Sequence, residues 1–218
     1  MQLYLFYFAV FIGIIPLLVF IIRRKSLTEV SAIEPFLWLI VISGFYELIG
    51  TLLFSLPTDP WFRTYCLMEF AAVFYFFYTL LKDVYRLVLL ISGSLYLLLY
   101  VLLLFFWDNW DNLITESYLS IFIALFVFCC SVLWFKNIFS SMSESSLVQS
   151  PLFYFISGFI LYFSGTLFLF LVSSLMVKNT ALSLGEHWIL IIIFNIILRI
   201  LLIIGIWKAL RKSVQYSG

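Results

Sequence analysis

The sequence predicts an all-α membrane protein that folds as a bundle of seven transmembrane helices. Of its 218 residues, 65% are hydrophobic, 21% are aromatic and only 11% are charged, and a soluble domain needs far more polar surface than this. Apolar runs of about twenty residues recur along the chain, and a helix of that length crosses the roughly 30 Å hydrocarbon core of a bilayer. Strands of a β-barrel would instead alternate over about ten residues.

Seven spans are predicted, with short connections between them. Their approximate bounds are 2–22, 36–56, 63–81, 87–107, 117–135, 152–177 and 188–207. Turn and cap residues separate them, as PTDP does after the second span and DNWDN does after the fourth. Tryptophans stand at several span ends, where interfacial side chains anchor membrane helices. We therefore expect residues 1–218 to form one transmembrane domain with no soluble domain.

The basic residues predict the orientation of the bundle. Nine of them follow the first, third and fifth spans or lie in the tail: Arg23, Arg24, Lys25, Lys82, Arg86, Lys136, Lys208, Arg211 and Lys212. Only Arg63 and Lys178 lie on the opposite side. Because cytoplasmic loops carry the excess of Lys and Arg, the N-terminus is expected outside and the C-terminus in the cytoplasm.

The second and sixth spans are similar to each other. Residues 35–54 read PFLWLIVISGFYELIGTLLF and residues 151–170 read PLFYFISGFILYFSGTLFLF, so both begin at proline and contain SGF followed by GT. A duplication would explain this as a parallel 3+1+3 repeat, the plan of several seven-helix folds. Chance explains it equally well, because Phe, Leu, Ser and Gly are abundant in such spans.

Four strongly polar residues fall inside the predicted spans, and we call them the polar cluster: Glu47, Glu69, Asn195 and Arg199. They lie roughly 10–17 Å below the outer ends of their helices at 1.5 Å per residue. Charges at this depth are costly, so we expect the four side chains to face inward, with Arg199 paired to Glu47, Glu69 or both. One arginine cannot neutralise two carboxylates, so one glutamate is expected to be protonated near neutral pH.

Four further residues accompany the polar cluster: Ser43 shares a helix face with Glu47, Tyr162 lies on a stripe of small residues in the sixth span, and His187 and Trp188 stand at the outer start of the seventh span. Together with the polar cluster they are the candidate binding and coupling residues. Asn195 and Arg199 are four residues apart and therefore share one face of the seventh span. His187 is the only histidine, and it would either sense external pH or simply start the last helix at the interface.

Catalytic, cofactor and metal sites are not expected. No span contains a lysine that could hold retinal as a Schiff base. The chain has no HExxH motif, no paired histidines and no nucleophile elbow. Its three cysteines show no zinc or haem spacing. We therefore predict that the protein is not an enzyme, has no cofactor and does not bind nucleic acid.

The third, sixth and seventh spans carry a family resemblance in the segments YCLMEFAAVFYFF, ISGFILYFSGTLFLF and HWILIIIFNIILRILLIIGIW. The chain resembles a group of bacterial seven-helix membrane modules that occur alone or in association with sensor histidine kinases. Glu69, His187, Asn195 and the SGF and GT pairs fit the pattern of that group. Where the pattern has a second amide one turn after the first, this chain has Arg199. The resemblance implies a signalling role, a kinase partner and a location in a bacterial inner membrane.

Three functions are compatible with these observations. The first is a membrane sensor or signalling component that responds to an extracellular, lipophilic or proton stimulus at the polar cluster. Lacking long loops, it would act through a membrane or cytoplasmic partner protein, such as a histidine kinase. The second is a small parallel-repeat transporter of a solute or protons that uses the same residues near the midplane. The third is a structural accessory subunit, because buried ion pairs can merely fix helix register.

Overall fold

The computed structural model describes residues 2–51, 58–106, 112–141, 147–176 and 184–217, and these ranges contain helices and short turns but no strand. The long helices are α1 (Gln2–Ile22), α2 (Glu34–Phe45), α3 (Thr58–Phe106), α4 (Asn112–Ser141), α5 (Pro151–Met176) and α6 (Leu184–Ser217). Shorter elements are η1 (Arg24–Ser26), η2 (Thr28–Ile33), η3 (Tyr46–Thr51) and η4 (Leu147–Gln149). In the described part of the chain, six helical segments are long and apolar enough to cross a membrane.

The outer surface of the bundle is apolar, as a lipid-facing surface is. Large hydrophobic side chains point outward along every long helix, with Tyr4, Phe11 and Phe105 exposing 79%, 66% and 75% of their surface. Exposed apolar patches on soluble monomers are far smaller than a surface covered this way. Together with the six apolar helical segments, this surface identifies a multi-pass, all-helical membrane protein.

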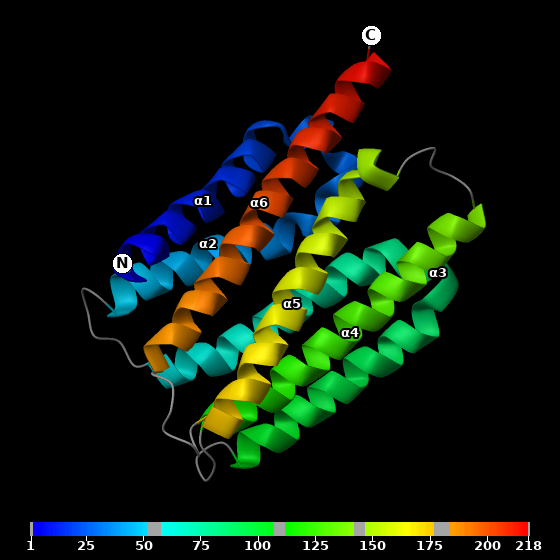
Figure 1. Cartoon of the computed structure of the whole chain (residues 1–218). Coiled ribbons are helices and arrows are strands. Elements are labelled where there is room, and N and C mark those ends of the chain that lie inside the picture. Colours follow the sequence, from blue (N-terminus) through cyan, green and yellow to red (C-terminus); the bar gives the residue numbers. More distant parts are fainter. Residues whose placement is uncertain (1, 52–57, 107–111, 142–146, 177–183, 218) are drawn as a thin grey trace.

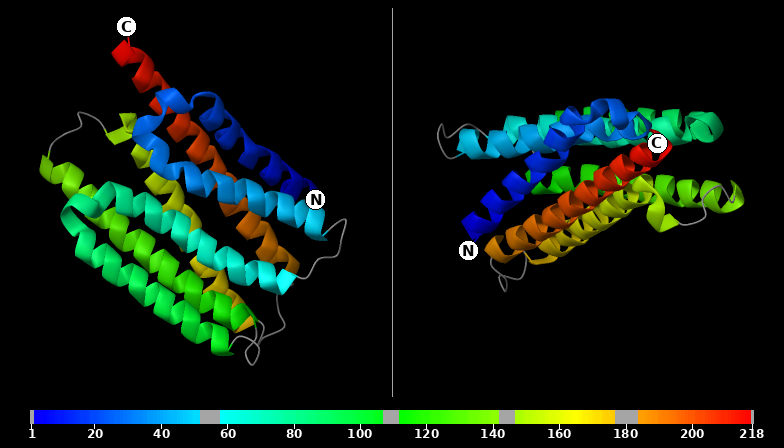
Figure 2. Two further views of the ribbon diagram at one scale, coloured as in Figure 1. Left: turned by 180° about the vertical axis from the view of Figure 1, so that it is seen from behind. Right: turned by 90° about the horizontal axis from the view of Figure 1, so that it is seen from above.

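The helices pack in a closed order around a core of aromatic side chains. α5 and α6 share the most extensive contact; α1 and α4 flank this pair, and α2 and α3 complete the bundle. Figure 2 shows α2 and α3 in one layer and α5 and α6 in another. The Phe159 ring of α5 bridges the layers, with its centroid 4.8 Å from that of Phe36 and 5.2 Å from that of Phe76. The two chain ends lie at opposite ends of the bundle (Figure 1).

Helix α3 contains both the third and the fourth predicted spans. The sequence predicts a break at 82–86, and the structure interrupts the helix inside this window at Tyr85, where the backbone is not helical (φ −119°, ψ 23°). The chain reverses there, and the two halves of α3 run side by side (Figure 1). The Tyr96 hydroxyl donates a hydrogen bond to the carbonyl of Cys66 at 2.8 Å, and that of Tyr100 donates to the carbonyl of Arg63 at 3.1 Å.

The second predicted span, 36–56, differs from the structure at its start, and its predicted end lies outside the described residues. Its helix begins two residues earlier, at Glu34, and follows the two short 3₁₀ helices η1 and η2. Leu27 and Ile33 of this entry segment are fully buried, so the connection packs into the bundle and does not form a free loop. After Phe45 the helix continues as the π-helix η3, which carries Glu47. Residues 52–57 lie outside the described part of the chain.

Candidate polar site inside the bundle

Glu69 lies on the first half of α3 and exposes 7% of its surface. Two tyrosine hydroxyls donate hydrogen bonds to the same carboxyl oxygen, Oε1. Tyr65, one turn earlier on α3, is 3.1 Å away, and Tyr162 of α5 is 3.5 Å away. The buried carboxyl group is therefore held by hydroxyl donors from two helices, which offset part of the cost of removing it from water.

Aromatic rings connect this carboxyl group to the end of α2. Trp61, Tyr65 and Glu69 are spaced by four residues and follow one face of α3. The ring of Trp61 stacks on Tyr46 of η3, with centroids 4.1 Å apart and planes 12° apart, and its centroid lies 6.1 Å from that of Tyr65. Because stacked rings fix each other's orientation, a movement of η3 would reach Tyr65 and hence Glu69.

Arg199 of α6 points into the bundle, where it exposes 8% of its surface. Its guanidinium lies against α1 at Gly13: a Cβ atom placed on that glycine would be 3.2 Å from both Cζ and Nε of Arg199. The charge of Arg199 interacts with Glu47, Tyr65 and Tyr162. Among the described residues, no acceptor bonds to its Nε and Nη1 atoms, although both are buried.

Glu47 lies in η3 and is half-buried. A π-helix bonds each residue to the fifth one back, which rotates the following side chains away from their α-helical positions; such segments are frequent at functional sites. Glu47 interacts electrostatically with Arg199, whereas Glu69 accepts hydrogen bonds from Tyr65 and Tyr162. Of the two predicted partners of Arg199, Glu47 is the one whose charge interacts with it, and Glu69 bonds to Tyr65 and Tyr162, which also interact with Arg199.

The remaining candidate residues lie around this group. Asn195 is half-buried, and its Nδ2 atom donates a hydrogen bond to the carbonyl of Ile191 on its own helix at 3.3 Å. Ser43 is half-buried one turn before Glu47 on α2. His187 and Trp188 belong to α6, but their side chains lie outside the described part of the structure, so their predicted roles stay predictions.

The sequence alone did not single out Tyr65, Gly13 or the π-helix. Tyr65 carried a usable signal, because the four-residue spacing of Trp61, Tyr65 and Glu69 places all three on one helix face. Gly13 could be connected with Arg199 only through the tertiary contact of α1 with α6. Nothing in the residues 46–51 distinguishes a π-helix from an α-helix.

The chemistry available here is ionic and hydrogen-bonding. Within the described ranges, no three His, Cys, Asp or Glu side chains are grouped closely enough to hold a metal ion. Comparison with known proteins finds no matching family model, no matching curated protein and no matching solved structure. The resemblance to kinase-associated seven-helix modules therefore stays a prediction based on the sequence.

Proposed function

We propose that the protein is a seven-span sensor or signalling component of a bacterial inner membrane that acts through a partner protein. In this proposal each half of α3 crosses the bilayer, the N-terminus lies outside and the C-terminus lies in the cytoplasm. The apolar segment Pro60–Phe105 has 46 residues, which corresponds to about 70 Å of straight helix and is more than twice the hydrocarbon thickness. Its reversal at Tyr85 is what two crossings require.

The observation that carries the proposal is the buried Arg199, two of whose donors have no acceptor among the residues that the structure describes. A charged donor left without an acceptor costs more than the 1–3 kcal/mol or so of a neutral group, and intramembrane charges commonly mark functional sites. A purely structural ion pair would be expected to satisfy its guanidinium within the fold. An acceptor on an incoming stimulus molecule would bond to Arg199, and a change in protonation of Glu47 would change the charge that faces Arg199. Either event would shift the position that the Arg199 side chain prefers.

Helix α6 offers a route from this site to a partner. It runs without interruption through Leu184–Ser217, 34 residues or about 50 Å, which exceeds the thickness of the hydrocarbon core. Figure 1 shows its C-terminal turns extending past the other helices. The C-terminal part of α6 carries Lys208 and Arg211, and the Arg211 guanidinium lies 3.9 Å from the ring centroid of Trp207. A small shift of a rigid helix at Arg199 would therefore also move these basic residues.

The test is photo-cross-linking in cells from a reactive amino acid placed at position 211. We expect one specific partner, whose cross-linking yield changes in Glu47→Gln and Arg199→Met but not in the matched surface variant Arg23→Gln. Each variant is also purified, and its thermal stability is measured to separate signalling from folding. Proton or solute flux in liposomes that Glu69→Gln abolishes would overturn the proposal in favour of the transporter. Stability loss with an unchanged cross-link would favour the structural subunit.

A further inference from the structure

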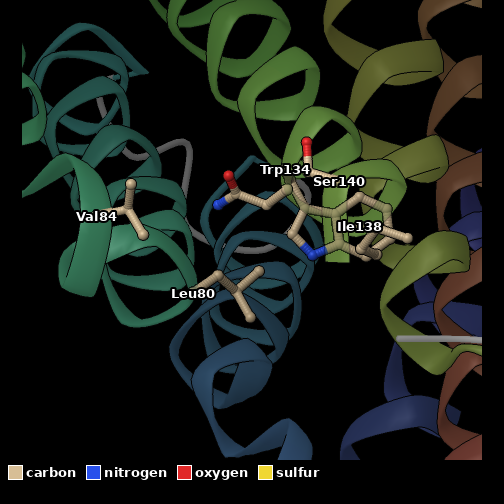
Figure 3. A pocket seen from close by; sticks show the side chains of 6 residues that line it. Leu80, Val84, Trp134, Ile138 and Ser140 are labelled. Carbon is tan, nitrogen blue, oxygen red and sulfur yellow. The ribbon is translucent and has the colours of Figure 1, made fainter. Parts of the chain in front are cut away.

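A groove opens between helices α3 and α4 at the end of the bundle where α3 reverses. Its volume is about 450 Å³, within the range of small-ligand sites. Figure 3 shows the lining side chains, which are Leu80, Val84, Trp134, Asn137, Ile138 and Ser140. Leu80 lies eleven residues after Glu69, about 16 Å along the helix. The groove is therefore separate from the polar site.

The walls of the groove differ in character. Leu80 and Val84 form an apolar wall on α3, and Trp134 and Ile138 form one on α4. The polar lining comes from Asn137 and Ser140, near the end of α4. The Tyr85 hydroxyl donates a hydrogen bond to Oδ1 of Asn137 at 3.3 Å. This bond ties the turn of α3 to α4 and uses the acceptor of the amide, which leaves its N–H groups as donors.

None of the groove-lining side chains is charged, and the charge at the turn of α3 and near the end of α4 around the groove, which we call its rim, is mainly positive. Lys82 and Arg86 flank the turn of α3, and Lys136 stands on α4; all three are exposed. Lys136 is four residues before Ser140 and shares a helix face with it. Among the described residues 80–86 at the turn of α3, the acidic residue is Asp83. The rim therefore favours an anion.

Beside the groove the surface is strongly apolar. Val84, Leu87 and Phe139 expose 66%, 72% and 64% of their surface. An occupant must therefore combine an anionic group at the rim with long apolar chains along these side chains. Membrane phospholipids have this construction, whereas a soluble anion or an acidic peptide would leave the apolar side chains uncovered.

We propose that the groove binds an anionic glycerophospholipid. Its phosphate lies near Lys136, Ser140 and the amide of Asn137, and its acyl chains run along Val84 and Leu87. Basic pockets between transmembrane helices on the cytoplasmic side commonly bind such headgroups. Lipid bound here would link the turn of α3 to α4 at this end of the bundle.

The test compares retention of phosphatidylglycerol and phosphatidylcholine by the detergent-solubilised protein in native mass spectrometry. We expect preferential retention of phosphatidylglycerol. Replacing Lys82 and Lys136 together with Gln should weaken it about 10- to 30-fold, since each basic residue near a lipid headgroup contributes about 1 kcal/mol. The matched control is the double variant Arg23→Gln and Arg211→Gln, which removes two positive charges away from the groove and should change binding less than twofold.

A second measurement locates the lipid. Phosphatidylglycerol with brominated acyl chains should quench tryptophan fluorescence, and the quenched fraction should fall in Trp134→Phe. Equal retention of the two lipids, equal weakening by the control double variant or unchanged quenching in Trp134→Phe would each overturn the proposal. Binding of soluble glycerol 3-phosphate as tight as that of the lipid would also overturn it, because the acyl chains would then contribute nothing.

Discussion

At the scale of single residues, the arrangement around Arg199 separates two glutamates that the sequence treats alike. Glu47 interacts with the guanidinium by charge, and Glu69 is held by the hydroxyls of Tyr65 and Tyr162. Both lie inside apolar helices, but they meet different chemical partners. Two substitution series can measure this difference.

The first series tests the coupling between Arg199 and Glu47. Arg199→Met and Glu47→Gln should each lower the free energy of unfolding, and the double variant should lose less than the sum, by about 0.5–3 kcal/mol. The reason is that removing one charge leaves its buried partner uncompensated. The free energies are measured by reversible unfolding in mixed micelles. Arg199→Met combined with Glu34→Gln, in the surface pair with Arg24, is the control and should be additive. A coupling energy no larger than in the control would contradict the interaction of Arg199 with Glu47.

The second series tests the hydroxyl groups at Glu69. Tyr65→Phe should cost about 1 kcal/mol of stability, because its hydroxyl is 3.1 Å from Oε1. Tyr162→Phe should cost less, since its 3.5 Å distance is long for a hydrogen bond between oxygens. Tyr75→Phe, at a half-exposed position on the same helix, should be neutral. The same unfolding assay measures all three, and the opposite order of Tyr65 and Tyr162 would refute the geometry.

At the scale of helices, glycines set how closely α5 and α6 approach. A Cβ atom on Gly165 would be 2.5 Å from the Phe194 ring, and one on Gly205 would overlap the Phe155 ring. Close backbone approach through small residues is typical of helix pairs in membranes. The second and sixth predicted spans, which are similar in sequence, pack against different helices. Gly158 packs on Leu198 of α6, whereas Gly44 packs on Val10 of α1. The similar segments therefore make different helix contacts, and the 3+1+3 repeat stays a prediction.

This packing predicts a large effect of one methyl group. Gly205→Ala should destabilise the protein by about 1–3 kcal/mol, because overpacking forces the Phe155 ring and the helix backbone to shift. Gly44→Ala is the matched control: its nearest neighbour is a movable methyl of Val10 at 3.2 Å, so its cost should be smaller. Thermal unfolding in detergent gives both values. Equal stability of the two variants would show that α5 and α6 are less tightly packed.

At the scale of the whole molecule, the reversal of α3 at Tyr85 decides how many times the chain crosses the bilayer. The proposed orientation puts this turn on the same side as the end of α6, and the start of α3 on the other. Two of the basic groups that predict the orientation, Lys82 and Arg86, flank the turn and are exposed. The groove between α3 and α4 lies at this same end.

Cysteine labelling tests this topology. In a variant without the native cysteines (Cys66, Cys129 and Cys130), Asp83→Cys and Arg211→Cys should react with a membrane-impermeant maleimide only in inverted vesicles. Pro60→Cys, at the start of α3, should react in intact cells. The expected pattern follows from the excess of basic residues on the cytoplasmic side. Labelling of Asp83→Cys and Pro60→Cys from the same side would mean that the first half of α3 does not cross the membrane.

The sequence by itself determined the fold class and the residues that must avoid lipid. Long apolar runs allow only membrane-crossing helices here, because each backbone polar group must be paired within its own segment. Glu69 and Arg199, which the sequence predicts to face inward, are both buried. These conclusions depend on hydrophobicity and helical period, which are local properties of the chain.

Tertiary structure decided which groups meet. The contact of Arg199 with Gly13 and the approach of Tyr162 to Glu69 join helices that are distant in the chain, and the stacking of Tyr46 on Trp61 joins the consecutive elements η3 and α3. The π-helix at Glu47 also has no local sequence signal. Helix contacts depend on side-chain shape across whole interfaces, and many pairings of apolar helices satisfy the same hydrophobic pattern. For this reason the sequence names the polar residues, and only their packing assigns the partners.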